Sequence, residues 1–245
     1  MERKVKAVTS AVRIHPSGDR CLIVEFGRRI APDINYAVRS LAATLLQHPL
    51  PGVTDVVPAF ATVAIYYRPE AIAGLRADAS PHELLCEQVQ AIVARGIAPP
   101  QGDARVVDIP VCYEGEFAPD LAEVAALCKL TRDQIIERHG ASPHVVYMLG
   151  FAPGFAYIGG LDKRLVVPRR ASPRTRIPTG SVAIADELSA IYPLQTPGGW
   201  NVIGRTPLKL FDPNASPPCL LQPGDEVRFI AISLQEFQRM LATQS

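Results

Sequence analysis

The chain has 245 residues, of which 48% are hydrophobic and 20% charged, and its formal net charge is +1. That length accommodates two modest domains or one large one, and the near-neutral charge gives no electrostatic reason to expect nucleic acid or an anionic membrane as a partner. No run reaches the ~18 apolar residues of a membrane span, and the start at Met1–Val5 lacks the apolar core of a signal peptide, so we expect a cytoplasmic protein.

The first hundred residues alternate between strand and helix patterns. The predicted elements are strands at 11–15 and 20–26, a helix at 32–47, a hairpin at 53–57 and 62–67, a helix from 80–83 to Gly96, and a strand at 104–111. The second helix is predicted from a capping box, Ser80 with Glu83, and from Pro81 at the first helical position. This order predicts an α+β domain of ferredoxin-like arrangement over residues 1–103, with 98–103 as a turn-rich linker.

The rest of the chain is rich in turns, because 12 of the 23 prolines lie between Pro143 and Pro223 and separate its short apolar runs. Two short helices are predicted to begin at Asp120 and Thr131, with Glu123 and Gln134 completing their caps. The second of these ends at 139–140, and a last helix covers 234–243. Short apolar runs separated by Pro/Gly turns lie at 145–150, 165–168, 181–185, 208–211 and 227–232. This spacing is typical of a closed β-barrel or a sandwich and predicts a mainly β domain over residues 104–245.

The sequence carries no self-contained catalytic or metal-binding motif. A G-x-S-x-G elbow is absent, and the five scattered cysteines form no C-x-x-C pair. His139 and His144 are the closest histidines, but Gly140 and Pro143 break any helix between them, so we expect no metal site. Residues 199–206 have the spacing of a phosphate loop, but the bulky interior and the proline that follows argue against one.

Arginines are concentrated in one short segment. Four of them lie between Pro168 and Pro178, namely Arg169, Arg170, Arg174 and Arg176. Prolines stiffen this backbone and lower the entropy cost of presenting side chains, and a guanidinium binds carboxylate or phosphate in bidentate fashion. In an extended segment Arg174 and Arg176 point to the same face and could share a small anion. A solvated loop explains the same residues equally well.

Aromatic and glycine residues gather on two turns. The residues that could wall a pocket or line a ligand site are Phe151, Phe155, Tyr157, Tyr192, Gly198, Gly199 and Trp200. Aromatic side chains on a turn after a buried strand can form a pocket wall, and paired glycines permit close backbone approach. The same aromatic residues could equally be core plugs, and the tryptophan could cap one end of a barrel.

Taken in order, these segments resemble one protein family. The matching stretches are Gly150-Phe151-Ala152-Pro153-Gly154-Phe155, Pro168-Arg169, Pro173-Arg174, Pro178-x-Gly180-Ser181-Val182, Ile191-Tyr192-Pro193 and Pro197-Gly198-Gly199-Trp200-x-x-x-Gly204-x-Thr206, with Asp108-Ile109-Pro110-Val111 and Pro119-Asp120-Leu121 upstream. The chain is similar to the family of the 5-oxoprolinase B subunit, allophanate hydrolase subunit 1 and the kinase inhibitor Kip. The similarity covers nearly the whole chain and is strongest over 105–232.

The resemblance implies a cyclophilin-like barrel in the C-terminal region and a protein that is inactive alone. Together with subunits A and C, such a protein opens the lactam ring of 5-oxoproline to give glutamate. ATP, with Mg, is expected in the assembled complex and not on this chain alone. Because the substrate carries a carboxylate, we expect an anion site formed by Arg169, Arg174, Ser181, Tyr192, Gly198, Gly199 and Trp200, with Phe151, Phe155 and Tyr157 as its wall.

The sequence departs from the family at one loop. Where the family usually has a glycine-rich stretch with Gln-Thr-Gly, this chain has Asp186-Glu187-Leu188-Ser189-Ala190, which is bulkier and more acidic. The departure leaves the exact substrate open. Two alternatives stand beside the 5-oxoprolinase interpretation: a Kip-type inhibitor that binds a sensor histidine kinase, and a carboxyltransferase-type subunit of urea or allophanate metabolism.

Overall fold

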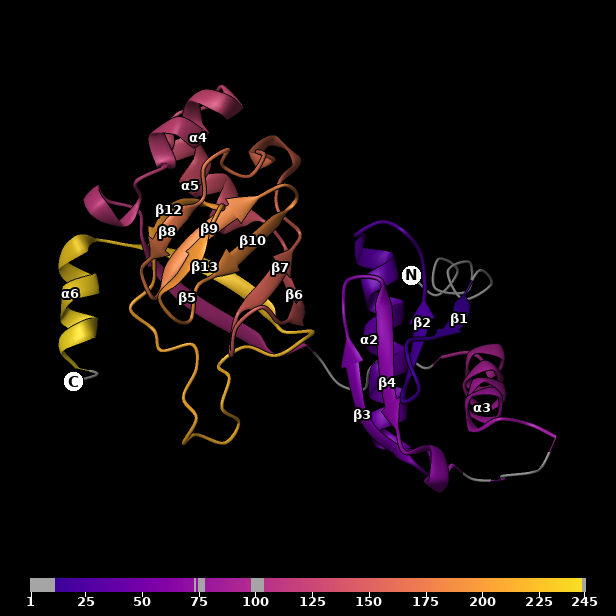
Figure 1. The fold of residues 1–245 in the computed structure, drawn as a ribbon. Coiled ribbons are helices and arrows are strands. Elements are labelled where there is room, and N and C mark those ends of the chain that lie inside the picture. The colour runs from indigo at the N-terminus through magenta and orange to yellow at the C-terminus, as the bar shows by residue number, and fades with distance from the viewer. Residues whose placement is uncertain (1–11, 73, 75–77, 98–103, 244–245) are drawn as a thin grey trace. The chain divides into compact units, whose positions relative to one another are not determined.

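The computed structural model describes residues 12–72, 74, 78–97 and 104–243 (Figure 1). Contacts between Cα atoms divide the chain into two compact units, Met1–Asp103 and Ala104–Ser245. The predicted linker at 98–103 lies outside the described residues. Each unit buries an apolar core of its own.

The described part of the first unit is an antiparallel sheet with two α-helices. Its elements are β1 (Arg13–Pro16), β2 (Cys21–Glu25), α2 (Pro32–Gln47), β3 (Val53–Pro58), β4 (Thr62–Tyr67), the short 3₁₀ helix η1 (Pro69–Ala71) and α3 (Pro81–Arg95). The strands lie in the order β1-β2-β4-β3. The predicted helices and strands of this unit are confirmed, including the Ser80–Glu83 capping box of α3.

Helical periodicity explains the core of this unit. Ile34, Val38, Leu41 and Leu45 recur on one face of α2, and all four are buried. Burying a leucine side chain of this kind stabilises the fold by about 1.5–3 kcal/mol. The stripe packs against the buried face of the sheet, where Leu22, Val24, Val63 and Ile65 have essentially no exposed surface.

The strand that follows α3 lies in the second unit, Ala104–Ser245, as the predicted domain bounds have it, although the order of elements grouped it with the first. In the predicted order it completed the α+β domain, but in the structure it is β5 (Val106–Cys112), which pairs with β12 and β13 in the second unit. Its apolar face explains the difference, because Ile109 and Val111 pack into the core of the barrel and not against the first sheet.

The second unit is built on a closed barrel of seven strands. Its elements are β5, η2 (Gly115–Phe117), α4 (Leu121–Cys128), α5 (Arg132–Ala141), β6 (His144–Leu149), β7 (Ala156–Gly159), η3 (Lys163–Leu165), β8 (Arg174–Ile177), β9 (Ser181–Ala185), β10 (Leu188–Ile191), β11 (Thr196–Gly198), β12 (Asn201–Arg205), β13 (Glu226–Ile232) and α6 (Leu234–Ala242). The barrel order is β10-β7-β6-β13-β5-β12-β9, with β8 and β11 as a separate ribbon. Only the β5–β13 pair is parallel among the described barrel pairings. The predicted barrel is therefore present.

Helices and short strands complete this unit. Helix α4 contacts β12, α5 contacts β13 and α6 contacts β5. The predictions of strands at 165–168 and 208–211 are wrong, because these residues form only isolated bridges, at Val167 and Phe211. The ribbon strands β8 and β11 and the barrel strands β7, β10 and β12 were not predicted. Strands β9 and β10 are buried at every position, so neither shows the alternation that marks a half-exposed strand. None of the described helices combines the length and apolar character that crossing a membrane requires.

Candidate functional site

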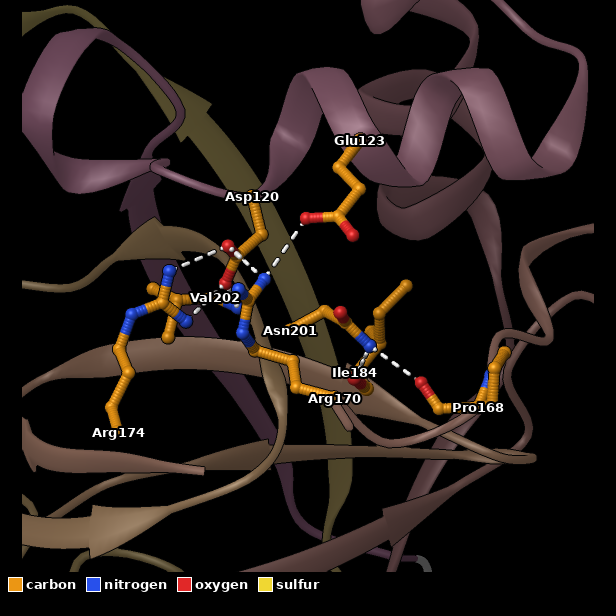
Figure 2. Close-up of polar contacts among 8 residues, drawn as sticks. All are labelled: Asp120, Glu123, Pro168, Arg170, Arg174, Ile184, Asn201 and Val202. Atoms are coloured by element: carbon orange, nitrogen blue, oxygen red, sulfur yellow. Dashed lines mark hydrogen bonds and ion pairs between the residues drawn. The ribbon is translucent and has the colours of Figure 1, made fainter. Parts of the chain in front are cut away.

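The arginine segment is fastened to the barrel along its length. Strand β8 pairs with β11, which places Arg174 opposite Gly198. The Arg170 amide donates to the carbonyl of Gly199 at 2.7 Å. The buried side chain of Asn201 donates to the carbonyls of Pro168 at 2.9 Å and Ile184 at 3.3 Å (Figure 2). These bonds fix the backbone from which the arginines project, so the segment is not a freely solvated loop.

Two of the arginines turn inward onto one buried carboxylate. Asp120 is 2% exposed and accepts from Arg174 at 2.7 and 2.6 Å and from Arg170 at 2.7 Å, while Arg170 also reaches Glu123 at 2.9 Å (Figure 2). We call these four residues the Asp120 cluster. The hydrogen bonds to Asp120 raise the pKa of Arg174 above its ordinary value. A buried carboxylate with several charge-assisted partners is fully compensated inside the chain.

The predicted helix cap at Asp120 is wrong in its chemistry. Asp120 occupies the N-cap position of α4, but its side chain makes no capping hydrogen bond. Its Oδ2 atom instead accepts from the Val202 amide at 2.7 Å, and the Asp120 amide donates to the Val202 carbonyl at 3.0 Å. The carboxylate therefore ties the start of α4 to β12 and to the arginine segment. The stretch Pro119-Asp120-Leu121, noted in the family resemblance, was the available sign of this role.

Arg169 points away from the Asp120 cluster. Its guanidinium carbon lies 5.7 Å from the ring centroid of Trp200, a cation–π arrangement. Its nearest carboxylate among the described residues is that of Asp186, at 3.7 Å, and both side chains are more than 60% exposed. An exposed pair at that distance is weak. Of the two arginines assigned to the anion site, Arg169 is thus the one whose charge is available to a ligand.

The predicted aromatic residues come together beside Arg169. We call the group of Phe151, Phe155, Tyr157, Tyr192 and Trp200 the aromatic face. Phe155 is its centre, with ring centroids 5.2 Å from Phe151, 4.9 Å from Tyr157 and 5.1 Å from Tyr192. The rings of Tyr157 and Trp200 are 6.0 Å apart. Burial raises the pKa of Tyr192 to about 12, so its hydroxyl stays protonated. Phe155, Tyr192 and Trp200 are buried, whereas Phe151 is 65% exposed.

Backbone strain is concentrated in the same region. Phe151 has φ = 70° and Asp186 has φ = 52°, a left-handed conformation that few residues other than glycine adopt. The Asp186 amide donates to the carbonyl of Val167 at 2.7 Å, which holds this turn against the arginine segment. Strained residues with exposed side chains are often found at ligand-binding sites. Of the five residues that depart from the family, Asp186 therefore lies beside Arg169. The expectation of a loop is wrong for Leu188, Ser189 and Ala190, which are buried in strand β10.

The other residues predicted for the anion site, Gly198, Gly199, Ser181 and Arg174, do not all lie with Arg169. A side chain at Gly198 would collide with the hydroxyl of Tyr192, so glycine there lets the ribbon lie against that ring. The Gly199 carbonyl is occupied by Arg170. Ser181 and Arg174 line a pocket whose lining includes neither Arg169 nor any residue of the aromatic face. The structure thus groups Arg169 with the aromatic residues, whereas the side chains of Arg174 and Ser181 line a different pocket, although the Ser181 carbonyl accepts from the Tyr192 amide at 2.9 Å.

A buried polar network that sequence reasoning missed crosses the barrel core. The Tyr113 hydroxyl lies 2.8 Å from Nδ1 of His139, whose Nε2 lies 3.1 Å from the Ser189 hydroxyl, and His144 donates to the His139 carbonyl at 2.8 Å. Burial holds the pKa of His139 well below its ordinary value and lowers that of His144 to about 4. Both imidazoles are neutral. Among the described residues, no group of three His, Cys, Asp or Glu side chains is placed to hold a metal ion.

The fold and the site define a class of protein: a β-barrel with an arginine segment that leads into the β8–β11 ribbon, and an aromatic face built from the β6–β7 turn, β7 and the residues that follow β10 and β11. Residues 12–221 match the family described as "Carboxyltransferase domain, subdomain C and D", and the chain belongs to that family. The spacing that resembled a phosphate loop, 199–206, contains strand β12 in this fold.

Two relatives and one solved structure show how closely the chain follows known proteins. It is 40% identical to the 5-oxoprolinase B subunit of Bacillus subtilis (strain 168) over 238 residues, covering 94% of this chain and 97% of that protein. It is 38% identical to the 5-oxoprolinase B subunit of Escherichia coli O157:H7, covering 89% of this chain and 95% of that protein. The structure of TTHA0988 matches with a TM-score of 0.73 at 36% identity, over 87% of this chain. This chain spans only 40% of that one.

Proposed function

We propose that this chain is the B subunit of an ATP-dependent 5-oxoprolinase complex, which opens 5-oxoproline to glutamate together with subunits A and C. The observation that carries the proposal is the end-to-end similarity to the Bacillus subtilis B subunit, at 40% identity over 97% of that protein. Similarity of that extent includes both units of the chain and every segment that forms the aromatic face and the Asp120 cluster.

The site chemistry suits a small carboxylate attached to a flat ring. We propose that Arg169 binds the carboxylate of 5-oxoproline and that the exposed Phe151 and the half-buried Tyr157 contact its ring. The buried Phe155 and Trp200 back this wall. A guanidinium above an aromatic ring offers a charge-assisted hydrogen bond beside an apolar surface, which fits both halves of such a ligand. Tyr192, Gly198 and Gly199 do not contact the ligand in this proposal and instead allow the β8–β11 ribbon to lie against the barrel. Arg174 acts as a positioning residue through Asp120.

A lactam amide is a poor electrophile, so its hydrolysis needs an activated oxygen. Coupling to ATP converts that oxygen into a leaving group, with charge held by positioned cations. We propose that ATP with Mg is bound in the assembled complex and not by this chain alone, and that the chain alone is inactive. The one segment with phosphate-loop spacing is occupied by a barrel strand, which supports this division of roles.

The larger organisation is proposed on similar grounds. More than half of TTHA0988 lies outside the match, and we propose that this part corresponds to the companion barrel, the C subunit. We propose further that residues 1–103 and 104–245 are separate domains, that the first is a ferredoxin-like variant in which β1 occupies the fourth strand position, and that the protein is cytoplasmic.

The carboxyltransferase-type alternative is favoured by one observation, the name of the family itself. In that role the same barrel would act in urea or allophanate metabolism with a biotin-carrying partner. The two functions can be distinguished by the product of the assembled complex, because only a 5-oxoprolinase releases glutamate from 5-oxoproline.

The test is to co-purify the chain with subunits A and C from the same genome and to measure ATP-dependent glutamate release from 5-oxoproline. We expect turnover from the complete complex and none when any one of the three proteins or ATP is omitted. An assembled complex that hydrolyses no 5-oxoproline would contradict the proposal. Stable binding of a sensor histidine kinase, without turnover, would instead identify a Kip-type inhibitor.

A further inference from the structure

A polar pocket in the second unit shares no lining residue with the aromatic face. It has a volume of about 160 Å³ and is lined by Glu116, Phe117, Pro119, Arg174, Arg176, Pro178, Ser181, Val202 and Arg205. Three arginines thus face one glutamate. Arg174 is already neutralised by Asp120, which leaves Arg176 and Arg205 as the cations that determine the charge of the pocket.

Arg205 is held in place without a carboxylate. Its Nε atom donates to the Thr179 carbonyl at 2.8 Å, and its guanidinium carbon lies 5.6 Å from the centroid of the Phe117 ring. The Phe117 ring in turn stacks on Phe237 of α6, with centroids 4.5 Å apart. Within the described part of the chain, no carboxylate comes within 4 Å of the Arg205 guanidinium. The side chain is therefore preorganised, with its terminal nitrogens left for a ligand.

Arg176 and Ser181 complete the donors. Arg176 lies two residues after Arg174 on β8, so both side chains leave the same face of the strand. When the Gln195 carboxamide is turned so that its oxygen faces Arg176, that oxygen accepts from Nη2 at 3.0 Å and from Nε at 3.1 Å, and this neutral partner does not cancel the charge of Arg176. Ser181, which is buried at the start of β9, adds a hydroxyl.

We propose that this pocket binds a tetrahedral oxyanion, either inorganic phosphate or the phosphoryl end of a larger molecule. Guanidinium groups bind phosphate oxygens with charge-assisted, bidentate hydrogen bonds. The volume is below the roughly 300–1,000 Å³ of pockets that enclose whole drug-sized ligands, so the pocket accommodates a phosphoryl group and not a complete nucleotide. The inference rests on the pocket alone and does not require the proposed 5-oxoprolinase activity.

The experiment titrates the purified full chain with inorganic phosphate by calorimetry, with acetate as a planar carboxylate for comparison. We expect saturable phosphate binding that is about tenfold or more weaker in Arg205→Gln, since removing a charge-assisted hydrogen bond lowers affinity by at least about one decade. Arg176→Gln is expected to weaken binding in the same direction. Arg228→Gln is the matched control, because Arg228 forms an exposed ion pair with Asp108 on the outside of the barrel.

Two further measurements decide whether the bound phosphoryl group comes from free phosphate or from a nucleotide, and whether the pocket prefers phosphate to a carboxylate. If ADP competes with phosphate, the pocket accepts the phosphoryl end of a nucleotide; if only inorganic phosphate binds, the free ion is its ligand. The proposal is overturned if phosphate does not bind, if acetate binds equally well, or if Arg205→Gln and Arg176→Gln bind phosphate as the native chain does. Circular dichroism of each variant separates a binding defect from a folding defect, and Arg176→Gln, which is exposed on β8, keeps the test valid if Arg205→Gln does not fold.

Discussion

The Asp120 cluster and the aromatic face use similar residues for different purposes. Arginines of the same proline-braced segment serve both regions, but Arg174 finds its carboxylate inside the fold, whereas Arg169 lies over Trp200 of the aromatic face with only a weak exposed partner. In the first region the buried carboxylate is compensated within the chain. In the second, Phe151 and Asp186 carry left-handed backbone and exposed side chains. An arginine whose carboxylate partner is buried inside the fold, such as Arg174, therefore supports the structure. An arginine without such a partner, such as Arg169, is available to bind a ligand.

The largest effect is expected from breaking the Asp120 cluster. Asp120→Ala leaves Arg170 and Arg174 partly buried without their shared carboxylate and frees the Val202 amide, so we expect a loss of about 3–5 kcal/mol in the free energy of unfolding. Denaturant unfolding measures this. Glu123→Gln is the control, because the Glu123 side chain is 59% exposed and its ion pair should contribute no more than about 1 kcal/mol. Equal effects of the two substitutions would show that Asp120 is not the support that we describe.

The second effect concerns pH and the buried histidines. Burial lowers the pKa of His144 to about 4, whereas in the unfolded chain it is near 6.5. Between pH ~6.5 and 4 the His144 imidazole is therefore protonated in the unfolded chain but not in the folded one. The contribution of neutral His144 to the free energy of unfolding is fully present above pH ~6.5 and is lost as the pH falls toward 4. One such group costs about 3 kcal/mol across that window, and His139 adds to the loss in the same direction.

Unfolding free energies measured between neutral pH and pH 4 check this prediction. His144→Gln keeps an amide that can donate to the His139 carbonyl but cannot titrate, so its stability should fall less steeply with acid. An unchanged slope in that variant would mean that other groups dominate the acid sensitivity of the barrel.

The third effect tests the aromatic face. Arg169→Gln should lower the activity of the assembled complex by roughly one to two decades, because a charge-assisted hydrogen bond contributes about 1.5–3 kcal/mol, while stability stays nearly unchanged. Trp200 is the only tryptophan in the chain, so its fluorescence reports ligand binding directly. Arg164→Gln, an exposed arginine on η3, is the control. A loss of activity without any change in the fluorescence titration would place Arg169 outside the binding site.

Local sequence signals predicted much of the fold. The stripe on α2 and the capping boxes of α3 and α5 were readable because the interactions that form them lie within four residues. The barrel class followed from short apolar runs between turns. Strand β8 was missed as a strand because its residues, Arg174 to Ile177, are mostly polar and its partner β11 is only three residues long.

The candidate site was only partly predictable, because some of its contacts join residues that are far apart in the sequence. The aromatic residues and Arg169 were all identified, but not which arginine would stay available. That choice depends on Asp120, which lies 50 positions before Arg170 and 54 before Arg174, a separation over which no local pattern carries information. Asp186 was noted as a departure from the family, but its placement beside Arg169 depends on the β9–β10 turn and its bond to Val167.

The smallest expected effect comes from substituting Asp186, which changes the charge around Arg169 and leaves Arg169 itself intact. It therefore tests directly whether a nearby counter-charge limits ligand binding by Arg169. Asp186→Asn removes the carboxylate 3.7 Å from the guanidinium and keeps a residue that tolerates left-handed backbone. In water an ion pair at about that distance is worth roughly 1 kcal/mol, so a ligand carboxylate that competes with Asp186 should bind about fivefold more tightly. Fluorescence titration of Trp200 with 5-oxoproline measures the change.

Glu187→Gln is the matched control for this last substitution, since it removes the same charge from the same turn without an ion pair to Arg169 among the described residues. We expect its affinity for 5-oxoproline to stay close to that of the native chain. If Asp186→Asn binds more weakly, Asp186 is itself a ligand contact and not a competitor. If both substitutions tighten binding equally, the effect comes from the general charge of the loop, and the specific pairing of Asp186 with Arg169 has no part in it.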